Sequence, residues 1–90
     1  MEFTHRSYEK GQTIAAIATP PGEGGIAIIR ISGADAIDVA EKIFDGPIRT
    51  FKTHTVHFGK ILDLAGRVID EGLVILMRAP RSFTGEDTVE

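Results

Sequence analysis

The sequence predicts an α+β domain in which one or two helices pack on a small mixed sheet that is mainly antiparallel. Three observations support this fold class. Two short apolar runs, 13–19 and 26–31, flank a loop of prolines and glycines. Apolar residues then recur at helical spacing over 32–44, and alternating strand patterns follow at 53–62 and 68–77. With 90 residues, the chain has room for one domain with one modest core.

The run 13–19 contains small apolar and β-branched residues throughout, so we expect a strand that is buried on both faces. Two prolines and three glycines between 20 and 25 predict a loop. In the following strand, 26–31, alternation places Arg30 on one face with two isoleucines, Ile26 and Ile28. The two strands and the loop between them suggest a hairpin.

The segment 32–44 is the clearest helix. Ser32 and Asp35 have the spacing of a capping-box-like pair, and Gly46 with Pro47 predicts the end of the helix. Five apolar residues form one stripe at helical spacing: Ala36, Ile37, Ala40, Ile43 and Phe44.

The rest of the chain predicts an antiparallel strand pair and the start of another element. In 53–62, alternation places His54, Val56, Phe58 and Lys60 on one face and Thr55, His57 and Ile61 on the other. An acidic pair beside a glycine, at 70–72, suggests a β-bulge inside the second strand. Near the end, Val89 suggests a further strand, which would place Glu90 on a partly covered face. The abrupt end of the chain suggests an incomplete domain.

Composition narrows the classes of function. The chain has 10 Lys and Arg against 13 Asp and Glu, and the basic residues are scattered, so direct binding of nucleic acid is not expected. The absence of cysteine excludes disulfides and thiolate metal sites. The apolar runs are too short to span a membrane, and residues 1–11 lack the apolar core of a secretory signal. We expect a cytoplasmic protein with a poorly ordered tail at 1–11 and one domain at 12–90.

Several motifs are absent or misleading. Gly22, Gly24 and Ala27 match a dinucleotide fingerprint by letter, but an isoleucine-rich strand follows where that fingerprint requires a helix. No phosphate-gripping P-loop is present. His54 and His57 are three residues apart, which on a strand sends them to opposite faces, so no metal site is expected. No catalytic arrangement of side chains is supported.

Arg30 is the most informative residue, because a guanidinium among isoleucines must be paired. It either forms a structural ion pair with a carboxylate or directs its donors toward an acidic or carbonyl-rich ligand. The residues alone leave these two readings even. Glu90 is read first as solvated surface, although a carboxylate held in a strand there could accept paired N–H donors from a heterocycle.

The stretch QTIAAIATPPGEGGIAIIRISG, followed in order by ADAIDVAEKIF, HTVHFGKI and SFTGEDTVE, resembles the start of the MnmE (TrmE) family of tRNA modification GTPases. The resemblance covers Thr13 to Glu90. It implies a truncated N-terminal domain that is similar to the tetrahydrofolate-binding domain of aminomethyltransferase-type proteins. It further implies a homodimer that binds a 5-formyltetrahydrofolate-type one-carbon donor, with Arg30 and Glu90 contacting the folate. Glu23 departs from the family pattern, since a basic residue is common there.

The same resemblance implies functions that lie outside this segment. The parent protein would hydrolyse GTP with potassium and magnesium in a separate G domain. With a flavin-dependent partner, MnmG, it would modify the wobble uridine of certain tRNAs in a 5-carboxymethylaminomethyl-type reaction, and tRNA would be held by the complete complex rather than by this segment. Two alternatives stay open: a fragment of an aminomethyltransferase-type folate enzyme, and a purely structural dimerisation domain.

Overall fold

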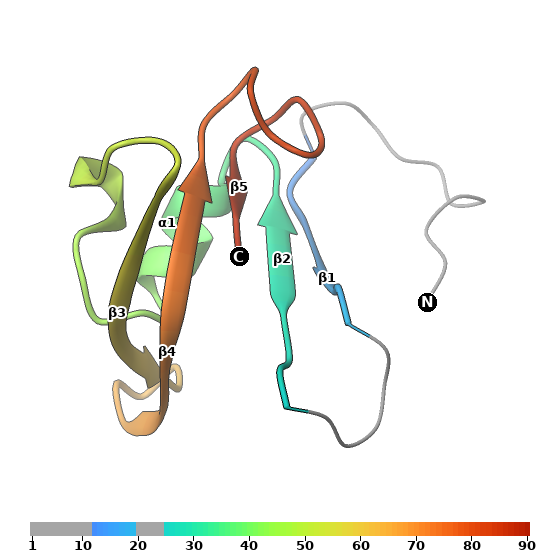
Figure 1. Cartoon of the computed structure of the whole chain (residues 1–90). Coiled ribbons are helices and arrows are strands. Elements are labelled where there is room, and N and C mark those ends of the chain that lie inside the picture. Colours follow the sequence, from blue (N-terminus) through green and yellow to red (C-terminus); the bar gives the residue numbers. More distant parts are fainter. Residues whose placement is uncertain (1–11, 20–24) are drawn as a thin grey trace.

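The computed structural model describes residues 12–19 and 25–90, and it contains a five-stranded sheet with one short helix and one 3-10 turn (Figure 1). The sheet order is β1-β2-β5-β4-β3, and each strand pairing is antiparallel among these residues. The predicted α+β class is therefore confirmed, without a parallel pairing in the described part. The predicted tail at 1–11 and most of the proline-glycine loop, 20–24, lie outside the described residues.

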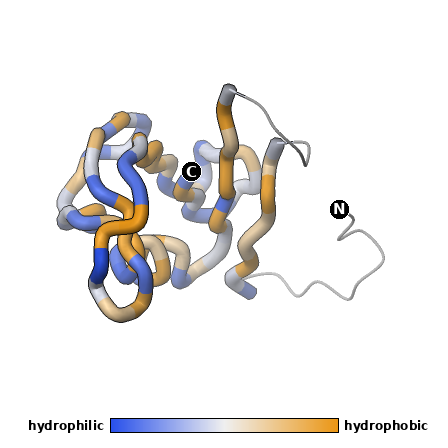
Figure 2. The backbone as a smooth tube through the Cα atoms, turned by 90° about the horizontal axis from the view of Figure 1, so that it is seen from below, coloured by the Kyte–Doolittle hydropathy of each residue, from blue (hydrophilic) through white to orange (hydrophobic). Residues whose placement is uncertain are grey.

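The predicted first hairpin is confirmed: β1 (Ile14–Ile17) pairs with β2 (Ile29–Ser32) in antiparallel register. Both strands are shorter than the apolar runs. The prediction that 13–19 is buried on both faces is wrong, because Ile17 is 55% exposed and Ala15 is exposed as well. β1 is an edge strand, and α1 packs on β2 and β5 instead. Figure 2 shows β1 and β2 as neighbouring segments with mostly apolar colouring, at one side of the molecule.

The helix α1 spans only Ala36–Glu41, so the predicted start and end are both wrong. Ser32 belongs to β2, and Asp35 occupies the N-cap position without a side-chain capping bond. The reason is Gly33, whose φ of +136° turns the chain sharply after β2. The Gly33 N–H donates to the Asp87 carbonyl oxygen at 3.0 Å, and the Asp35 N–H donates to Thr13 Oγ1 at 2.9 Å.

The predicted apolar stripe is confirmed as the helix side of the core, although its last two members lie beyond the end of α1. The 3-10 turn η1 (Ile48–Thr50) adds a buried isoleucine to it. The buried core contains four residues from the sheet and four from the covering layer: Ile31, Val74, Leu76 and Val89, then Ala36, Ala40, Phe44 and Ile48. Burial of these apolar side chains is the main force that holds the helix to the sheet.

Arg49 ties η1 to α1 at the surface. Its side chain reaches Glu41 and Asp38, and its backbone N–H donates to the Glu41 carboxylate at 3.0 Å. The hydrogen bonds from the Arg49 side chain are the main cause that lowers the pKa of Glu41 below its ordinary value. This contact closes the covering layer of the domain on its solvent side.

The second predicted hairpin is also confirmed, with β3 (Thr55–Leu62) pairing along β4 (Val68–Met77). The predicted faces are confirmed within β3, since Val56, Phe58 and Lys60 are exposed while the alternate residues are partly buried. The placement of His54 on this strand is wrong, because β3 begins at Thr55 and His54 has a φ of +62°. Gly59 is required on the inner face, because an added Cβ would lie 2.4 Å from the ring of Phe44.

The predicted bulge at 70–72 is wrong. β4 continues in regular pairing through these residues, and the irregularity lies one step nearer the turn, between Ile61 and Leu62, opposite Ile69. Gly72 pairs with Gly59, so two small residues pass each other without disturbing the ladder there.

The predicted strand near the chain end is confirmed as β5 (Thr88–Val89), which lies between β2 and β4. In Figure 1 it occupies the middle of the sheet in front of α1. Along the described residues, no helix combines the length and apolar character needed to cross a membrane.

Candidate ligand site

The two residues singled out in the sequence, Arg30 and Glu90, meet across the middle of the sheet. β2 and β5 pair Ile31 with Val89, so continuing the antiparallel register places Arg30 opposite Glu90. Their side chains form an ion pair, with Arg30 Nε 2.5 Å from Glu90 Oε2. Because strand side chains alternate, this pair lies on the sheet face that points away from α1.

The carboxylate is the more deeply held partner. The side chain of Glu90 is 9% exposed and that of Arg30 is 34% exposed. The backbone fixes Glu90 in place, since Glu90 and Ile75 exchange two N–H to carbonyl bonds of 2.9 and 2.7 Å. A charge this well covered is tolerated because its partner is at hydrogen-bond distance.

Phe83 completes the immediate surroundings of the guanidinium. The Arg30 guanidinium carbon lies 4.5 Å from the centroid of the Phe83 ring, a cation–π geometry. The ring itself is 68% exposed. Sequence reasoning missed this residue, because an exposed aromatic in a turn has no signal beyond the SFTGED motif around it.

Hydroxyl groups hold the loop that carries Phe83 against the sheet. Ser32 Oγ lies 2.6 Å from Thr84 Oγ1, and Thr84 Oγ1 lies 3.3 Å from Thr88 Oγ1. The Ser82 hydroxyl donates to the Glu86 carbonyl oxygen across the same turn. Ser32 and Thr88 are fully buried polar residues, so these bonds satisfy groups that would otherwise be costly to bury.

The ion pair leaves hydrogen-bonding capacity on both partners. Arg30 uses Nε, while its terminal nitrogens form no hydrogen bond with another residue in the described part of the chain. A guanidinium has four further N–H donors on those nitrogens, and a carboxylate has lone pairs beyond the one used here. The pair therefore agrees with the interpretation of Arg30 as a structural ion pair with a carboxylate. It also presents donors and acceptors together at a partly open surface.

An apolar surface lies on the same sheet face. By the pairing register and strand alternation, this face also carries Val56, Phe58 and Leu73, which are 55%, 69% and 61% exposed. Three large apolar side chains exposed side by side on neighbouring strands are typical of a surface that another molecule covers.

The two histidines of 53–62 have separate local partners. His54 Nδ1 lies 2.8 Å from Thr53 Oγ1. His57 stacks on Phe51 with ring centroids 3.6 Å apart, and its Nε2 lies 2.8 Å from Thr55 Oγ1. Packing and hydrogen bonding thus account for His57, as expected. No group of three or more metal-ligating side chains occurs among residues 12–19 and 25–90.

Comparison with known proteins identifies a family. Residues 13–90 match the family model described as GTP-binding protein TrmE N-terminus. The chain is 58% identical over all 90 residues to a tRNA modification GTPase MnmE from Protochlamydia amoebophila, of which it covers 20%. It is 60% identical over 81 residues, or 90% of the chain, to the protein of the same name from Chlamydia felis, of which it covers 18%. The chain thus spans about a fifth of the length of these relatives.

Proposed function

The chain belongs to the TrmE N-terminal domain family, and on that premise we propose that it is the tetrahydrofolate-binding and homodimerising module of a tRNA modification GTPase. The parent protein hydrolyses GTP with potassium and magnesium in a separate G domain. It works in the cytoplasm with a flavin-dependent partner, MnmG, on the wobble uridine of certain tRNAs. The observation that carries the folate part is the Arg30–Glu90 pair with Phe83 beside it.

The chemistry of this site suits a folate. The pterin ring of a folate has neighbouring N–H groups that can donate to a carboxylate, and a carbonyl oxygen that can accept from a guanidinium. Glu90 is held firmly enough by its backbone bonds to Ile75 to act as a fixed acceptor. The exposed ring of Phe83 offers a flat apolar surface beside the charged pair.

The homodimer is supported by the exposed apolar side chains of Val56, Phe58 and Leu73. They lie on the same sheet face as the ion pair, so a second copy seated there would cover the apolar surface and partly enclose the ligand site. Burying apolar area of this kind is the usual driving force of a stable protein interface.

Calorimetric titration with 5-formyltetrahydrofolate tests the folate part. The unchanged chain should bind in a saturable manner, and Arg30→Ala should weaken binding by roughly tenfold or more, since charge-assisted hydrogen bonds contribute about 1.5–3 kcal/mol. Arg67→Ala is the matched control, because Arg67 also pairs with a carboxylate but lies in the β3–β4 turn. Equal affinity in the Arg30 and Arg67 variants would remove Arg30 from the site.

Sedimentation velocity tests the dimer. Phe58→Asp should shift the chain toward monomer, because a carboxylate would have to be buried in the interface. Leu64→Asp places the same charge on an exposed residue of the β3–β4 turn, away from the proposed surface, and should leave the association unchanged. A monomeric unchanged chain, or an equal effect of both substitutions, argues against this surface.

The same two measurements separate the alternatives. A purely structural dimerisation domain would sediment as a dimer and bind no folate, and its Arg30 would pair only with Glu90. A fragment of an aminomethyltransferase-type enzyme would bind folate as a substrate, but the family match favours the GTPase family. Reading the gene beyond Glu90 for a P-loop decides between these two folate proteins.

A further inference from the structure

The charges of this chain are unevenly distributed. Residues 46–62 and 72–85 contain no Asp or Glu, yet they hold half of the ten Lys and Arg residues: Arg49, Lys52, Lys60, Arg78 and Arg81. The fold brings parts of these two segments together beyond one end of the β3–β4 hairpin. There the Arg78 N–H donates to Thr53 Oγ1 at 2.9 Å, and Arg78 Nη2 donates to the carbonyl oxygens of Arg49 and Phe51.

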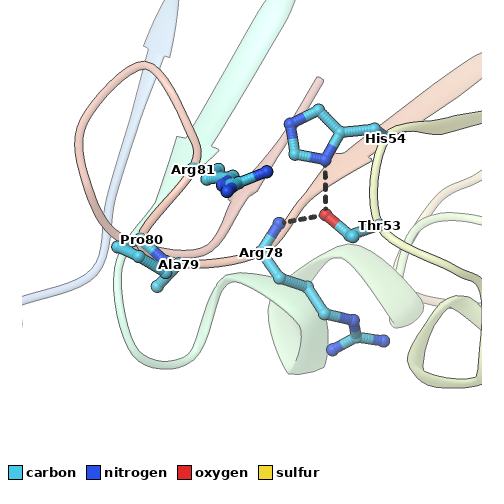
Figure 3. A pocket seen from close by; sticks show the side chains of 6 residues that line it. All are labelled: Thr53, His54, Arg78, Ala79, Pro80 and Arg81. Atoms are coloured by element: carbon cyan, nitrogen blue, oxygen red, sulfur yellow. Dashed lines mark hydrogen bonds between the residues drawn. The ribbon is translucent and has the colours of Figure 1, made fainter.

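An open pocket of about 430 Å³ lies at this junction, and six residues line it: Thr53, His54, Arg78, Ala79, Pro80 and Arg81. Figure 3 shows the Arg81 and His54 side chains on neighbouring sides of the pocket, while the Arg78 guanidinium points away from them. Arg78 therefore holds the two segments together, and Arg81 and His54 offer polar side chains to a ligand.

Within 12–19 and 25–90, no ion pair neutralises the arginines that line the pocket. Of the five described arginines, Arg30, Arg49 and Arg67 form ion pairs, whereas Arg78 and Arg81 form none with another described residue. One carboxylate touches the wall of the pocket: Asp87 Oδ1 accepts the Ala79 N–H at 2.8 Å. The pocket thus combines the charge of Arg81 with one fixed carboxylate, while the Arg78 guanidinium is held outside it by two backbone carbonyl oxygens.

His54 has an unusual backbone conformation and a set ring orientation. Its φ is +62°, which L-residues rarely adopt and which is more frequent at sites where function fixes the backbone. Thr53 Oγ1 accepts the Arg78 N–H and has one hydroxyl proton to give. When Thr53 gives that proton to His54 Nδ1, the neutral ring carries its own proton on Nε2, which then becomes a donor.

We propose that this pocket binds a phosphate group, with Arg81 and His54 Nε2 as donors. Arginine is the side chain best suited to phosphate oxygens, because its donors form a planar fork. The volume exceeds that of a phosphate alone, and Ala79 and Pro80 supply an apolar wall, so the sugar of a nucleotide also fits. The site is separate from Arg30 and Glu90 and does not depend on a folate function.

A phosphate site at this pocket differs from an expectation from the sequence. Scattered basic residues argued against nucleic acid, but Arg78 and Arg81 lie 24 residues or more after His54 and Thr53 in the chain and still meet them in space. The absence of acids over two long segments is the signal in the sequence that could have revealed the cluster.

NMR titration of the 90-residue chain tests the proposal, with inorganic phosphate and a single-stranded oligoribonucleotide as the two probes. Both should shift the ring signals of His54 and the guanidinium signals of Arg81. Arg81→Gln and His54→Asn should each weaken binding by roughly tenfold or more, because each loses a charge-assisted hydrogen bond. Asparagine is chosen because it tolerates a positive φ. Lys60→Gln, which removes one charge from β3 outside the pocket lining, should change nothing.

The two probes distinguish the source of the phosphate. If RNA is the natural ligand, the oligoribonucleotide binds more tightly than inorganic phosphate, and Arg81→Gln lowers its salt dependence by about one phosphate contact. If inorganic phosphate binds as tightly, the pocket is a site for free phosphate. Three results would each overturn the proposal of a separate phosphate site. Lys60→Gln could weaken binding as much as Arg81→Gln, or the signals that shift could exclude those of His54. In the third, 5-formyltetrahydrofolate displaces phosphate and Arg30→Ala weakens phosphate binding.

Discussion

The β3–β4 hairpin and the central seam, by which we mean the pairing of β5 with β2 and β4, are built in opposite ways. The hairpin joins two neighbouring segments of the chain through long regular pairing from Thr55 to Ile61. The seam joins distant segments through the two residues of β5 and the backbone bonds of Glu90. Local pairing closes a short loop, whereas the seam closes a long one at greater entropic cost. The candidate ligand site lies on the seam, which has fewer paired residues than the hairpin.

The largest expected effect comes from breaking the packing behind the seam. Leu76 is fully buried and pairs with Val89, so Leu76→Ala should lower the free energy of unfolding by about 2–5 kcal/mol. Leu73→Ala, in the same strand but 61% exposed, should cost far less. Urea unfolding followed by circular dichroism measures both. Similar losses in the two variants would mean that the buried core does not control stability.

The next effect concerns the turn between β2 and α1. A Cβ on Gly33 would lie 2.4 Å from Thr13 Cα, and its φ of +136° is unfavourable for other residues. Gly33→Ala should therefore destabilise the chain by roughly 1–3 kcal/mol. In the hairpin turn, Gly66→Ala meets open space and bears only the cost of a φ of +84°. Thermal unfolding of both variants compares the two turns, and a greater loss at Gly66 would contradict the crowding at Gly33.

Hydrogen exchange compares the seam and the hairpin directly within one strand. The Ile75 N–H donates to Glu90 across the seam, and strand alternation directs the Val74 N–H toward β3. Because β5 has only two residues, we expect the Ile75 amide to exchange on the order of tenfold faster than the Val74 amide. Exchange followed by NMR gives both rates, and equal protection would show that seam and hairpin open as one unit.

The smallest effect lies in the hairpin turn. Asp63 accepts the N–H groups of Ala65 and Arg67 and the Arg67 side chain, each at 2.9 Å. The Arg67 backbone hydrogen bond is the main cause that lowers the pKa of Asp63 below its ordinary value. A lowered folded-state pKa contributes stability that is present above the unfolded pKa and lost as pH falls through the folded one. The Ala65 and Arg67 amide shifts should therefore move in acid, and Asp63→Asn should abolish that transition.

The sequence predicted the local parts of this fold well and its boundaries poorly. Alternation alone placed the correct residues of β3 on each face, because side chains on a strand point to opposite sides in turn. It could not show that β1 lies at the sheet edge, where Ile17 stays exposed, since an apolar run carries no information about its neighbours. The prediction that Ser32 caps the helix is wrong because Gly33 turns the chain between Ser32 and the start of the helix.

The candidate site was foreseen in part. The reasoning that a guanidinium among isoleucines needs a partner is met by the Arg30–Glu90 pair, and its role toward a ligand stays a prediction. That these two residues stand opposite each other follows from the β2–β5 register, which local patterns do not contain. Phe83 and the Arg81 pocket were missed because each depends on how distant loops meet.

The position of β5 also couples the binding of a ligand at Arg30 and Glu90 to the stability of the fold. A small molecule that needs Arg30 and Glu90 together binds only when strands from 60 residues apart are joined. Mass action then adds its binding free energy to that of folding, about 2.7 kcal/mol at a free concentration one hundred times its Kd. Melting temperature would rise with dose, and exchange at Ile75 would slow more than exchange at Val74. The stability of the pairing between β5 and its neighbours would thus depend on how much ligand is bound.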